Sequence, residues 1–203
     1  MAAATRSMRL HGEDRRQALV EVAFHQIAEH GFEGLRTRDV ADGAGVNIAT
    51  LHYYFPTKEA LIRGVVARAM GRFRSTLAPH GSPDDQLLNH LKAVRALMRK
   101  EPEVGVVMGE LALRSARDAS LARILRETND AWHQTLRGLL RRGVSSGHLR
   151  KELDSDDAAA LIVATLTSMG LPSLNANRKD QALRELERWL SNARAPIRTR
   201  SSN

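Results

Sequence analysis

The sequence has no cysteine, few aromatic residues and no long hydrophobic run. Without cysteine, the chain has no disulfide framework, no thiolate zinc site and no cysteine nucleophile. An aromatic content of 4% offers little for stacking a flat cofactor, and we expect neither a cofactor nor a metal site. Residues 158–177 carry no charge, but polar side chains and Pro172 interrupt them, whereas a membrane-spanning helix needs about 20 mainly apolar residues. Residues 1–16 contain no apolar stretch long enough for a secretory signal, so we expect a cytoplasmic protein without membrane contact.

The chain carries a net charge of +8, from 31 basic and 23 acidic residues. This excess favours polyanionic partners such as nucleic acid, although it does not define the fold. The excess is not spread evenly, because residues 1–62 contain one more acidic than basic residue. That segment would therefore bind a polyanion through a few well-placed cations and helix N-termini, not through bulk charge.

Apolar residues recur at helical spacing through almost the whole chain and nowhere alternate, which predicts an all-α fold. About nine helices are expected, near residues 13–30, 38–44, 48–55, 57–77, 83–101, 103–116, 118–144, 155–171 and 178–194. Gly31 is expected to end the first helix in the left-handed conformation. Residues 1–12 and 195–203 have no apolar face and are expected to be mobile tails. Residues with N-cap chemistry precede five of the helices: Thr37, Thr57, Ser82, Asp118 and Asp154.

Two short helices joined by a glycine turn, within residues 35–61, fit a helix-turn-helix. Ala41 is small enough for the helices to cross closely, and Gly45, four residues later, supplies the turn. The second helix is then free to present its outer side chains to a DNA major groove, which is about 12 Å wide. The core beneath the crossing is expected to contain Val40, Val46 and Leu51.

Aromatic residues are concentrated at the end of this second helix. Tyr53, Tyr54 and Phe55 are consecutive, and they include both tyrosines of the chain. Three consecutive aromatic residues on a helix cannot all face inward, so at least one is exposed, and we expect Phe55 to be the core residue. Tyrosine hydroxyls suit phosphate oxygens, and Lys58 adds a charge beside the next helix N-terminus. The alternative is that these aromatic residues only fill a core.

Several short motifs across this segment follow the pattern of one known family. They are Gly31-Phe32, Thr37-Arg38-Asp39-Val40-Ala41, Ala44-Gly45-Val46, Leu51-His52-Tyr53-Tyr54-Phe55 and Lys58-Glu59-Ala60-Leu61. With these motifs, residues 15–65 resemble the tetracycline-repressor (TetR) family of bacterial transcription regulators. Beyond residue 65 the resemblance rests on length and helix order.

The resemblance implies a role for each matching position. Phosphate contacts are implied for Thr37, Tyr54 and Lys58. His52 stands where the family more often has tyrosine, and it contacts either a base or a phosphate. Arg38 is the expected direct reader, because a guanidinium can form two hydrogen bonds with guanine O6 and N7. Contacts to base edges or to the flanking backbone are implied for Arg38, Asn47, Ile48, Ala49, Thr50 and Tyr53.

Two helices near the C-terminus have the pattern of a pairing surface. Residues 155–171 are apolar nearly all round and need cover on two sides, and the last helix carries one apolar stripe. As in the family, these helices would form a four-helix interface with a second copy, although packing within one chain is the alternative. A twofold dimer would place two reading heads about 34–36 Å apart, one turn of DNA. The expected contacts are Leu161, Ala164, Thr165, Ser168, Leu183, Leu186, Trp189 and Leu190.

Apolar residues on inward stripes of several helices are candidates for lining an effector pocket, with ordinary core packing as the alternative for each. These candidates are Met70, Phe73, Met98, Met108, Trp132 and Met169, with His133, Asn129 or Thr165 to orient the ligand. Three other motifs are interpreted structurally. Gly143–Gly147 has the G-x-S-x-G pattern but is expected to be a helix-to-helix loop, because no strand precedes it. Asp154, Asp156 and Asp157 fit a helix start better than a cation site, and Gly105–Gly109 indicates close packing.

The sequence therefore predicts a homodimeric, all-α repressor with two domains. Residues 1–62 would form a helix-turn-helix head that binds a palindromic operator in double-stranded DNA. Residues 63–203 would form a body for dimerisation and for a small apolar or amphipathic effector that releases the operator. One alternative is a regulator of the same fold that senses a protein partner or nothing. A more remote alternative is an enzyme with a helical pocket, but no catalytic residue set is present and no enzymatic activity is expected.

Overall fold

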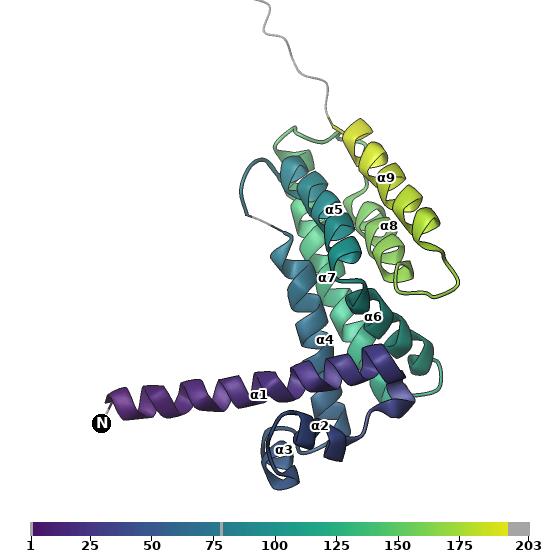
Figure 1. Cartoon of the computed structure of the whole chain (residues 1–203). Coiled ribbons are helices and arrows are strands. Elements are labelled where there is room, and N and C mark those ends of the chain that lie inside the picture. Colours follow the sequence, from purple (N-terminus) through teal and green to yellow (C-terminus); the bar gives the residue numbers. More distant parts are fainter. Residues whose placement is uncertain (1, 78, 195–203) are drawn as a thin grey trace, which may run out of the picture. The chain divides into compact units, whose positions relative to one another are not determined.

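The computed structural model describes residues 2–77 and 79–194, with side chains from Gly12 onward. Nine α-helices and one short 3-10 helix form the regular structure of these residues, which confirms the all-α prediction (Figure 1). They are α1 (Ala2–His30), η1 (Phe32–Gly34), α2 (Thr37–Gly43), α3 (Ile48–Tyr54), α4 (Lys58–Ser75), α5 (Pro83–Lys100), α6 (Pro102–Ser115), α7 (Ala119–Ser145), α8 (Ser155–Ser168) and α9 (Ala176–Asn192).

The chain folds into two compact units that are each built from two stretches of sequence. Unit 1 contains the residues up to Arg72 together with Glu101–Leu125, and unit 2 contains Phe73–Lys100 and the residues from Arg126 onward. Helix α6 thus belongs to the same unit as α1, α2 and α3. The functional division expected at residue 62 remains a prediction.

Side chains capping the helix N-termini set most helix starts as expected. Thr57 Oγ1 accepts a hydrogen bond from the Ala60 N–H at 3.0 Å, and Asp118 Oδ1 accepts one from Leu121 at 3.0 Å. Ser82 and Asp154 cap α5 and α8 in the same way. The expected cap at Thr37 is wrong. Helix α2 begins one residue earlier because the Arg36 carbonyl already accepts from the Val40 N–H at 3.0 Å, which makes Thr37 the first helical residue.

The ends of α1 differ from the prediction. The helix begins at Ala2 instead of near residue 13, so residues 2–12 are helical where a tail was expected. Helix propensity accounts for this, because the segment starts with three alanines and contains no proline. Gly31 has the expected positive φ of 70°, but its ψ of 177° lies outside the left-handed helical region. The tail expected at residues 195–203 lies outside the described residues.

The core of unit 1 is built on α1, which packs on α2, η1 and α6. Phe24 and Ile27 of α1 are fully buried, as are Leu61 and Val65 of α4. The Arg68 guanidinium lies 3.6 Å from the Phe24 ring centroid and forms a 2.6 Å ion pair with Glu21. These contacts join α4 to α1 and hold the helix that follows the helix-turn-helix.

Two glycines of α4 should respond in opposite ways to alanine. A Cβ at Gly64 would lie 2.9 Å from Val20 Cγ2, and a valine side chain has little freedom to move away. Gly64→Ala is therefore expected to lower the free energy of unfolding by about 1–3 kcal/mol. Gly71→Ala serves as the matched control because nothing lies within 4 Å of its Cβ position, and it should raise stability by about 0.5–1 kcal/mol. Urea denaturation of both variants measures the difference, and equal effects would contradict this account.

Unit 2 has α9 packed against α5 and α8 (Figure 1). Leu183, Leu186 and Leu190 of α9 are at most 5% exposed, and they pack inside the chain. Arg95 of α5 also reaches Glu187 of α9 with an ion pair of 3.1 Å. The apolar stripe of the last helix is therefore used within the protomer.

A buried histidine lies among aromatic residues in unit 2. His90 has no exposed surface and packs edge-on against Trp132, whose ring centroid is 5.6 Å from that of Phe73. Thr76 Oγ1 donates to the Phe73 carbonyl and lies 2.7 Å from His90 Nδ1, so the Nδ1–H is the donor of this second bond. His90 Nε2 has no partner among the described residues. Burial lowers the pKa of His90 to about 4, because the low-dielectric interior disfavours the imidazolium.

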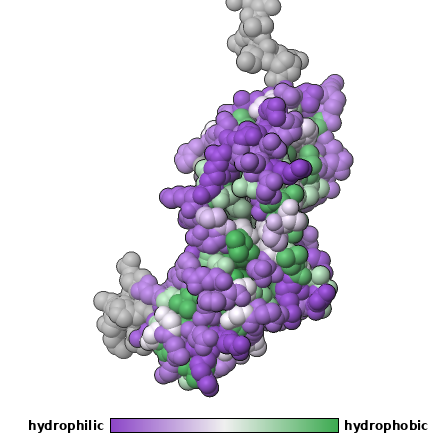
Figure 2. Space-filling view, turned by 45° about the vertical axis from the view of Figure 1, so that its right-hand side comes forward, coloured by the Kyte–Doolittle hydropathy of each residue, from purple (hydrophilic) through white to green (hydrophobic). Residues whose placement is uncertain are grey.

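Large apolar side chains are rarely exposed in the described chain. Ile48, Tyr53, Val106, Leu113 and Leu161 are the exposed ones. On the face shown in Figure 2, apolar residues form small areas within a mainly hydrophilic surface. None of the helices in residues 2–77 and 79–194 combines the length and apolar character that crossing a lipid bilayer requires.

Candidate nucleic-acid interface

The turn between α2 and α3 has the geometry expected of a helix-turn-helix. Gly45 has a φ of +66°, a conformation that favours glycine. The N–H groups of Gly45 and Val46 donate to the carbonyls of Asp42 and Ala41, both at 3.0 Å. Ala41 is buried at the crossing, and Val40 and Leu51 fill the core beneath it, as predicted. Val46 is only half-buried.

The outer side of α3 is open to solvent. Tyr53 is 80% exposed and Ile48 is 38% exposed, whereas Phe55 is buried, as predicted. The aromatic cluster therefore does not simply fill a core. Thr50 is half-buried, and its backbone N–H and its hydroxyl both donate a hydrogen bond to Asn47 Oδ1. We define the recognition face by its exposed members Asn47, Ile48, Ala49, His52 and Tyr53.

Asn47 is also the N-cap of α3, since its Oδ1 accepts a hydrogen bond from the Thr50 N–H at 2.8 Å. Asn47→Asp should keep this cap and the fold, but it would put a negative charge on the recognition face and weaken DNA binding. Asn47→Ala should lower the free energy of unfolding by about 1 kcal/mol through loss of the cap. Thermal unfolding and DNA titration of the two variants separate these roles. An aspartate variant that binds DNA as tightly as the parent would contradict the placement of Asn47 at the DNA.

The residues expected to hold phosphates, Thr37, Tyr54 and Lys58, lie on three successive helices of unit 1, α2, α3 and α4. Arg38 is exposed on the first turn of α2, next to the half-buried Thr37. Lys58 is exposed at the start of α4, and its Nζ lies 4.8 Å from the Phe32 ring centroid. Tyr54 is half-buried and packs edge-on against Tyr53, with the ring centroids 5.1 Å apart. Its hydroxyl points toward α1, because a Cβ at Gly12 would lie 3.5 Å from it.

The structure adds a cation that the sequence did not single out. Arg16 of α1 is exposed, and its guanidinium carbon lies 5.1 Å from the ring centroid of Phe55, which follows α3. Its position relative to α3 depends on how α1 crosses the helix-turn-helix. The spacing of apolar residues along α1 shows which side of that helix is buried, but it does not show which exposed arginine lies near α3.

Comparison with known proteins identifies the family. Residues 19–65 match the family model of bacterial regulatory proteins of the tetR family, and residues 77–171 match the tetracyclin repressor-like C-terminal domain. Together these matches span well over half of the chain. The chain belongs to the TetR family.

Individual relatives agree with this assignment. The transcriptional repressor KstR2 of Mycobacterium tuberculosis is 27% identical over 146 residues, which cover 70% of this chain and 72% of the relative. The fatty acid metabolism regulator protein of Bacillus subtilis is 24% identical over 152 residues, 73% and 77% of the two chains. The crystal structure of a TetR transcriptional regulator from Chloroflexus aurantiacus superposes with a TM-score of 0.74 at 25% identity, covering 92% of this chain and 99% of the other.

These relatives are transcription regulators and not enzymes, and the fold has the helix-turn-helix and helical body of TetR proteins. The chain is a DNA-binding transcriptional repressor of this family. Which of its residues contact DNA, a second copy or an effector is not given by these comparisons. Those residue assignments therefore stay predictions.

Fewer residues are available for pairing with a second copy than the sequence of this TetR-family chain predicted. Leu183, Leu186 and Leu190 are buried by the chain's own helices, so they cannot be the contacts to a second copy that their stripe indicated. The α8 residues remain available, because Leu161 is 46% exposed and Ala164 is exposed. Thr165, Ser168 and Trp189 are half-buried.

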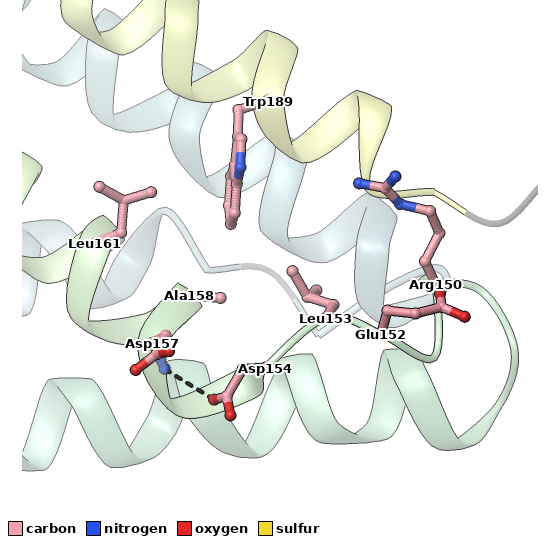
Figure 3. A pocket seen from close by; sticks show the side chains of 8 residues that line it. All are labelled: Arg150, Glu152, Leu153, Asp154, Asp157, Ala158, Leu161 and Trp189. Atoms are coloured by element: carbon pink, nitrogen blue, oxygen red, sulfur yellow. Dashed lines mark hydrogen bonds between the residues drawn. The ribbon is translucent and has the colours of Figure 1, made fainter.

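A cavity of 310 Å³ opens between α8, α9 and the loop before α8. Its apolar side is formed by Leu153, Ala158, Leu161 and Trp189, and Figure 3 shows the Trp189 ring directed toward Ala158. The charged residues that line it include Arg150 and Asp157. Trp189 and Leu161, both predicted pairing residues, are thus brought together, although the cavity itself could not be foreseen from helix stripes.

The residues predicted for the effector pocket are divided between the units. Met70 and Met108 belong to unit 1, whereas the others belong to unit 2. Phe73 and Trp132 pack together, and the half-buried His133 lies 3.2 Å from the Asp156 carbonyl oxygen at the start of α8. Met70 and Met169 are buried, and Met98 and Met108 are half-buried. None of these residues lines the cavities described here, so the effector pocket stays a prediction.

The three other motifs take the structural roles expected for them. Gly143 lies in the last turn of α7, and Gly147 has a φ of +74° in the turn that follows, so this motif is a helix-to-helix loop. Asp154 accepts hydrogen bonds from Asp156 and Asp157 as the cap of α8. Gly105 and Gly109 are buried in α6, which packs on α1. No cluster of potential metal ligands occurs in the part of the chain that the structure describes.

Proposed function

We propose that this repressor binds a palindromic operator as a homodimer, with α3 of each protomer in a major groove. The observation that carries this proposal is the recognition face, which is exposed while Leu51 and Phe55 beneath it are buried. A helix fixed by its inner side chains and capped by Asn47 can lie in the groove without rearrangement.

The resemblance to the family supports a base or backbone contact for each of these side chains. We assign base readout to Arg38 and to the recognition face, and phosphate contacts to Thr37, Tyr54 and Lys58. Thr50 would contact the DNA backbone beside the bases through its hydroxyl, which also donates a hydrogen bond to Asn47 Oδ1. His52 is exposed on the same side as Tyr53 and is able to contact a base or a phosphate.

Dimerisation would use the exposed side of α8 and the cavity beside it. Leu161 is one of the few large apolar side chains that the described chain leaves in water. Around it, Ala164, Thr165, Ser168 and Trp189 provide the small and aromatic residues that allow two helices to approach closely. Twofold pairing there would place two heads on adjacent half-sites.

An effector bound in the body would release the operator. The name of the Bacillus subtilis relative, a fatty acid metabolism regulator, agrees with a small apolar or amphipathic effector. To reduce operator occupancy from 99% to 1%, the effector must prefer the non-binding conformation by about 5.5 kcal/mol. The alternative within the family is control by a protein partner, or no effector.

Selection of random oligonucleotides with the purified protein tests the DNA and dimer assignments together. We expect the selected oligonucleotides to have twofold symmetry, with half-sites about one DNA turn apart. Leu161→Glu should give a monomer with weaker binding, and Leu113→Glu is the matched control because Leu113 is 52% exposed on α6. Sedimentation reports the oligomeric state of both variants. Asymmetric selected oligonucleotides, or a Leu161→Glu dimer with unchanged operator binding, would refute the proposal.

A further inference from the structure

A cavity of 220 Å³ lies in unit 1, outside the recognition face. It is open to solvent on one side and is bordered by η1, the first two turns of α4, the end of α6 and the first two turns of α7. The cavity is smaller than the 300–1,000 Å³ pockets that hold drug-sized molecules. Since each water in the liquid occupies about 30 Å³, the cavity has the volume of about seven waters. That is enough for one ring with a small substituent.

One side of the cavity is apolar. Phe32, Ile62, Leu121 and Ile124 line it, and each is at most 6% exposed, so their positions are fixed by packing. The Phe32 N–H also donates to Glu110 Oε2 at 3.3 Å, which ties η1 to α6. A ring placed against these side chains would exchange water for apolar contacts.

Two cations meet at the Phe32 ring. Lys58 Nζ lies 4.8 Å from the ring centroid and the Arg114 guanidinium carbon 5.4 Å. No carboxylate of the described chain forms an ion pair with Lys58. Arg114 forms a 2.6 Å ion pair with Glu33 through its NH1 group, but its Nε is buried and has no hydrogen-bond acceptor. Two cations therefore border the cavity, and no ion pair joins Lys58 to a carboxylate of the described residues.

The two acids that line the cavity already have partners. The Ser120 hydroxyl is the main cause that lowers the pKa of Glu59, and Arg63 and Arg123 lower it further. Asp118 caps α7 through the Leu121 N–H. Both carboxylates are therefore engaged, and neither forms an ion pair with Lys58 or Arg114 among the described residues.

The dipole of α4 adds to the attraction for an anion, whereas the carboxylate of Asp118 already stands at the N-terminus of α7. The N-termini of α4 and α7, helices of 18 and 27 residues, both border the cavity. Each terminus carries a partial positive charge of about half an elementary charge. The N-terminus of α4 and two cations, Lys58 and Arg114, therefore lie around one small space.

We propose that this cavity binds a small amphipathic anion, such as an aryl carboxylate, sulfonate or phosphate. Its anionic group would bind the Lys58 ammonium and the Arg114 guanidinium, and its ring would pack on Phe32 and Ile124. A regulatory consequence rests on the proposed function: Lys58 is a phosphate contact there, so an anion in the cavity competes with the operator for the same ammonium group.

Fluorine NMR with 4-fluorobenzenesulfonate tests the site directly on the full chain. We expect line broadening with the sulfonate and none with the neutral 4-fluorobenzenesulfonamide at the same concentration. Arg114→Met keeps the aliphatic stem but removes the donor, and should weaken binding about 10-fold. Ile124→Trp should fill the cavity and abolish binding. Arg137→Met is the matched control, because Arg137 is an ion-paired arginine on α7 that does not line the cavity, and it should bind like the parent.

Circular dichroism checks that each variant is folded. If either Arg114→Met or Ile124→Trp misfolds, the other variant still tests the site. Equal broadening by both probes, or sulfonate binding that survives Arg114→Met and Ile124→Trp, overturns the site. Operator titration with and without the sulfonate tests the competition, and we expect a higher apparent Kd that Arg114→Met restores to the parent value. Unchanged operator affinity at saturating sulfonate overturns the competition alone. If the protein binds no operator, the proposed function fails while the NMR result still decides the site.

Discussion

Replacing Arg38 with alanine is expected to reduce operator affinity more than any other single change in the head. A bidentate arginine contact to guanine contributes about 1–3 kcal/mol of discrimination. A dimer carries Arg38 twice, so the loss doubles to about 2–6 kcal/mol, or at least about 30-fold in Kd. Arg38 is exposed and its side chain supports no core contact, so folding should be unaffected.

The comparison with Lys58→Ala separates base recognition from phosphate binding. Removal of a phosphate contact weakens specific and non-specific DNA about equally, whereas Arg38→Ala should weaken only the selected operator. Arg178→Ala, at an exposed position on α9, is the control that should leave both affinities unchanged. Fluorescence anisotropy with operator and scrambled duplexes measures all three. A uniform loss for Arg38→Ala on both duplexes would assign Arg38 to phosphate and contradict its role as a reader.

Acidification is expected to destabilise the protein strongly because of His90. Its folded-state pKa of about 4 lies below the 6.5 of an exposed histidine. As the pH falls through 6.5, His90 becomes protonated in the unfolded chain but stays neutral in the folded chain. The free energy of unfolding therefore decreases from pH 6.5 down to about 4. The shift corresponds to about 3 kcal/mol, all of it present above pH 6.5.

His90→Phe should remove this share of the pH dependence while keeping a ring of similar size beside Trp132. Urea denaturation at pH 7 and pH 4.5 gives the free energies of unfolding, and the parent should lose about 2–3 kcal/mol more than the variant. His80→Gln, an exposed histidine, is the control and should behave like the parent. Identical losses in parent and His90→Phe would show that His90 is not buried in its neutral form.

Local sequence signals predicted most of the fold. Thr57, Asp118 and Asp154 cap helices as expected because a cap depends on residues two or three positions away. Gly45 turns where the spacing of the two short helices requires it. Where a prediction failed, the deciding interaction was either weak or distant. Residues 2–12 became helical through propensity, which burial patterns do not report.

The candidate sites were less predictable because they join residues far apart in sequence. Leu183 and Leu186 form a clear stripe, but a stripe does not say whether α5 or a second copy covers it. Arg114 meets Glu33 across 81 positions, and no periodicity connects them. The burial of His90 has no signal in the sequence, since its partner Thr76 lies outside any helix of the described chain.

The membership of α6 in unit 1 has a practical consequence for dissecting the protein. A gene fragment that stops after Arg72 would encode a head without Leu111 and Glu110, which α6 brings against α1 and η1 from beyond residue 100. Such a fragment would expose apolar surface of Phe32 and α1 and is a poor module for expression or for grafting onto another regulator. Chimeras that exchange DNA specificity between relatives should carry Glu101–Leu125 together with the first 72 residues, as two inserts rather than one.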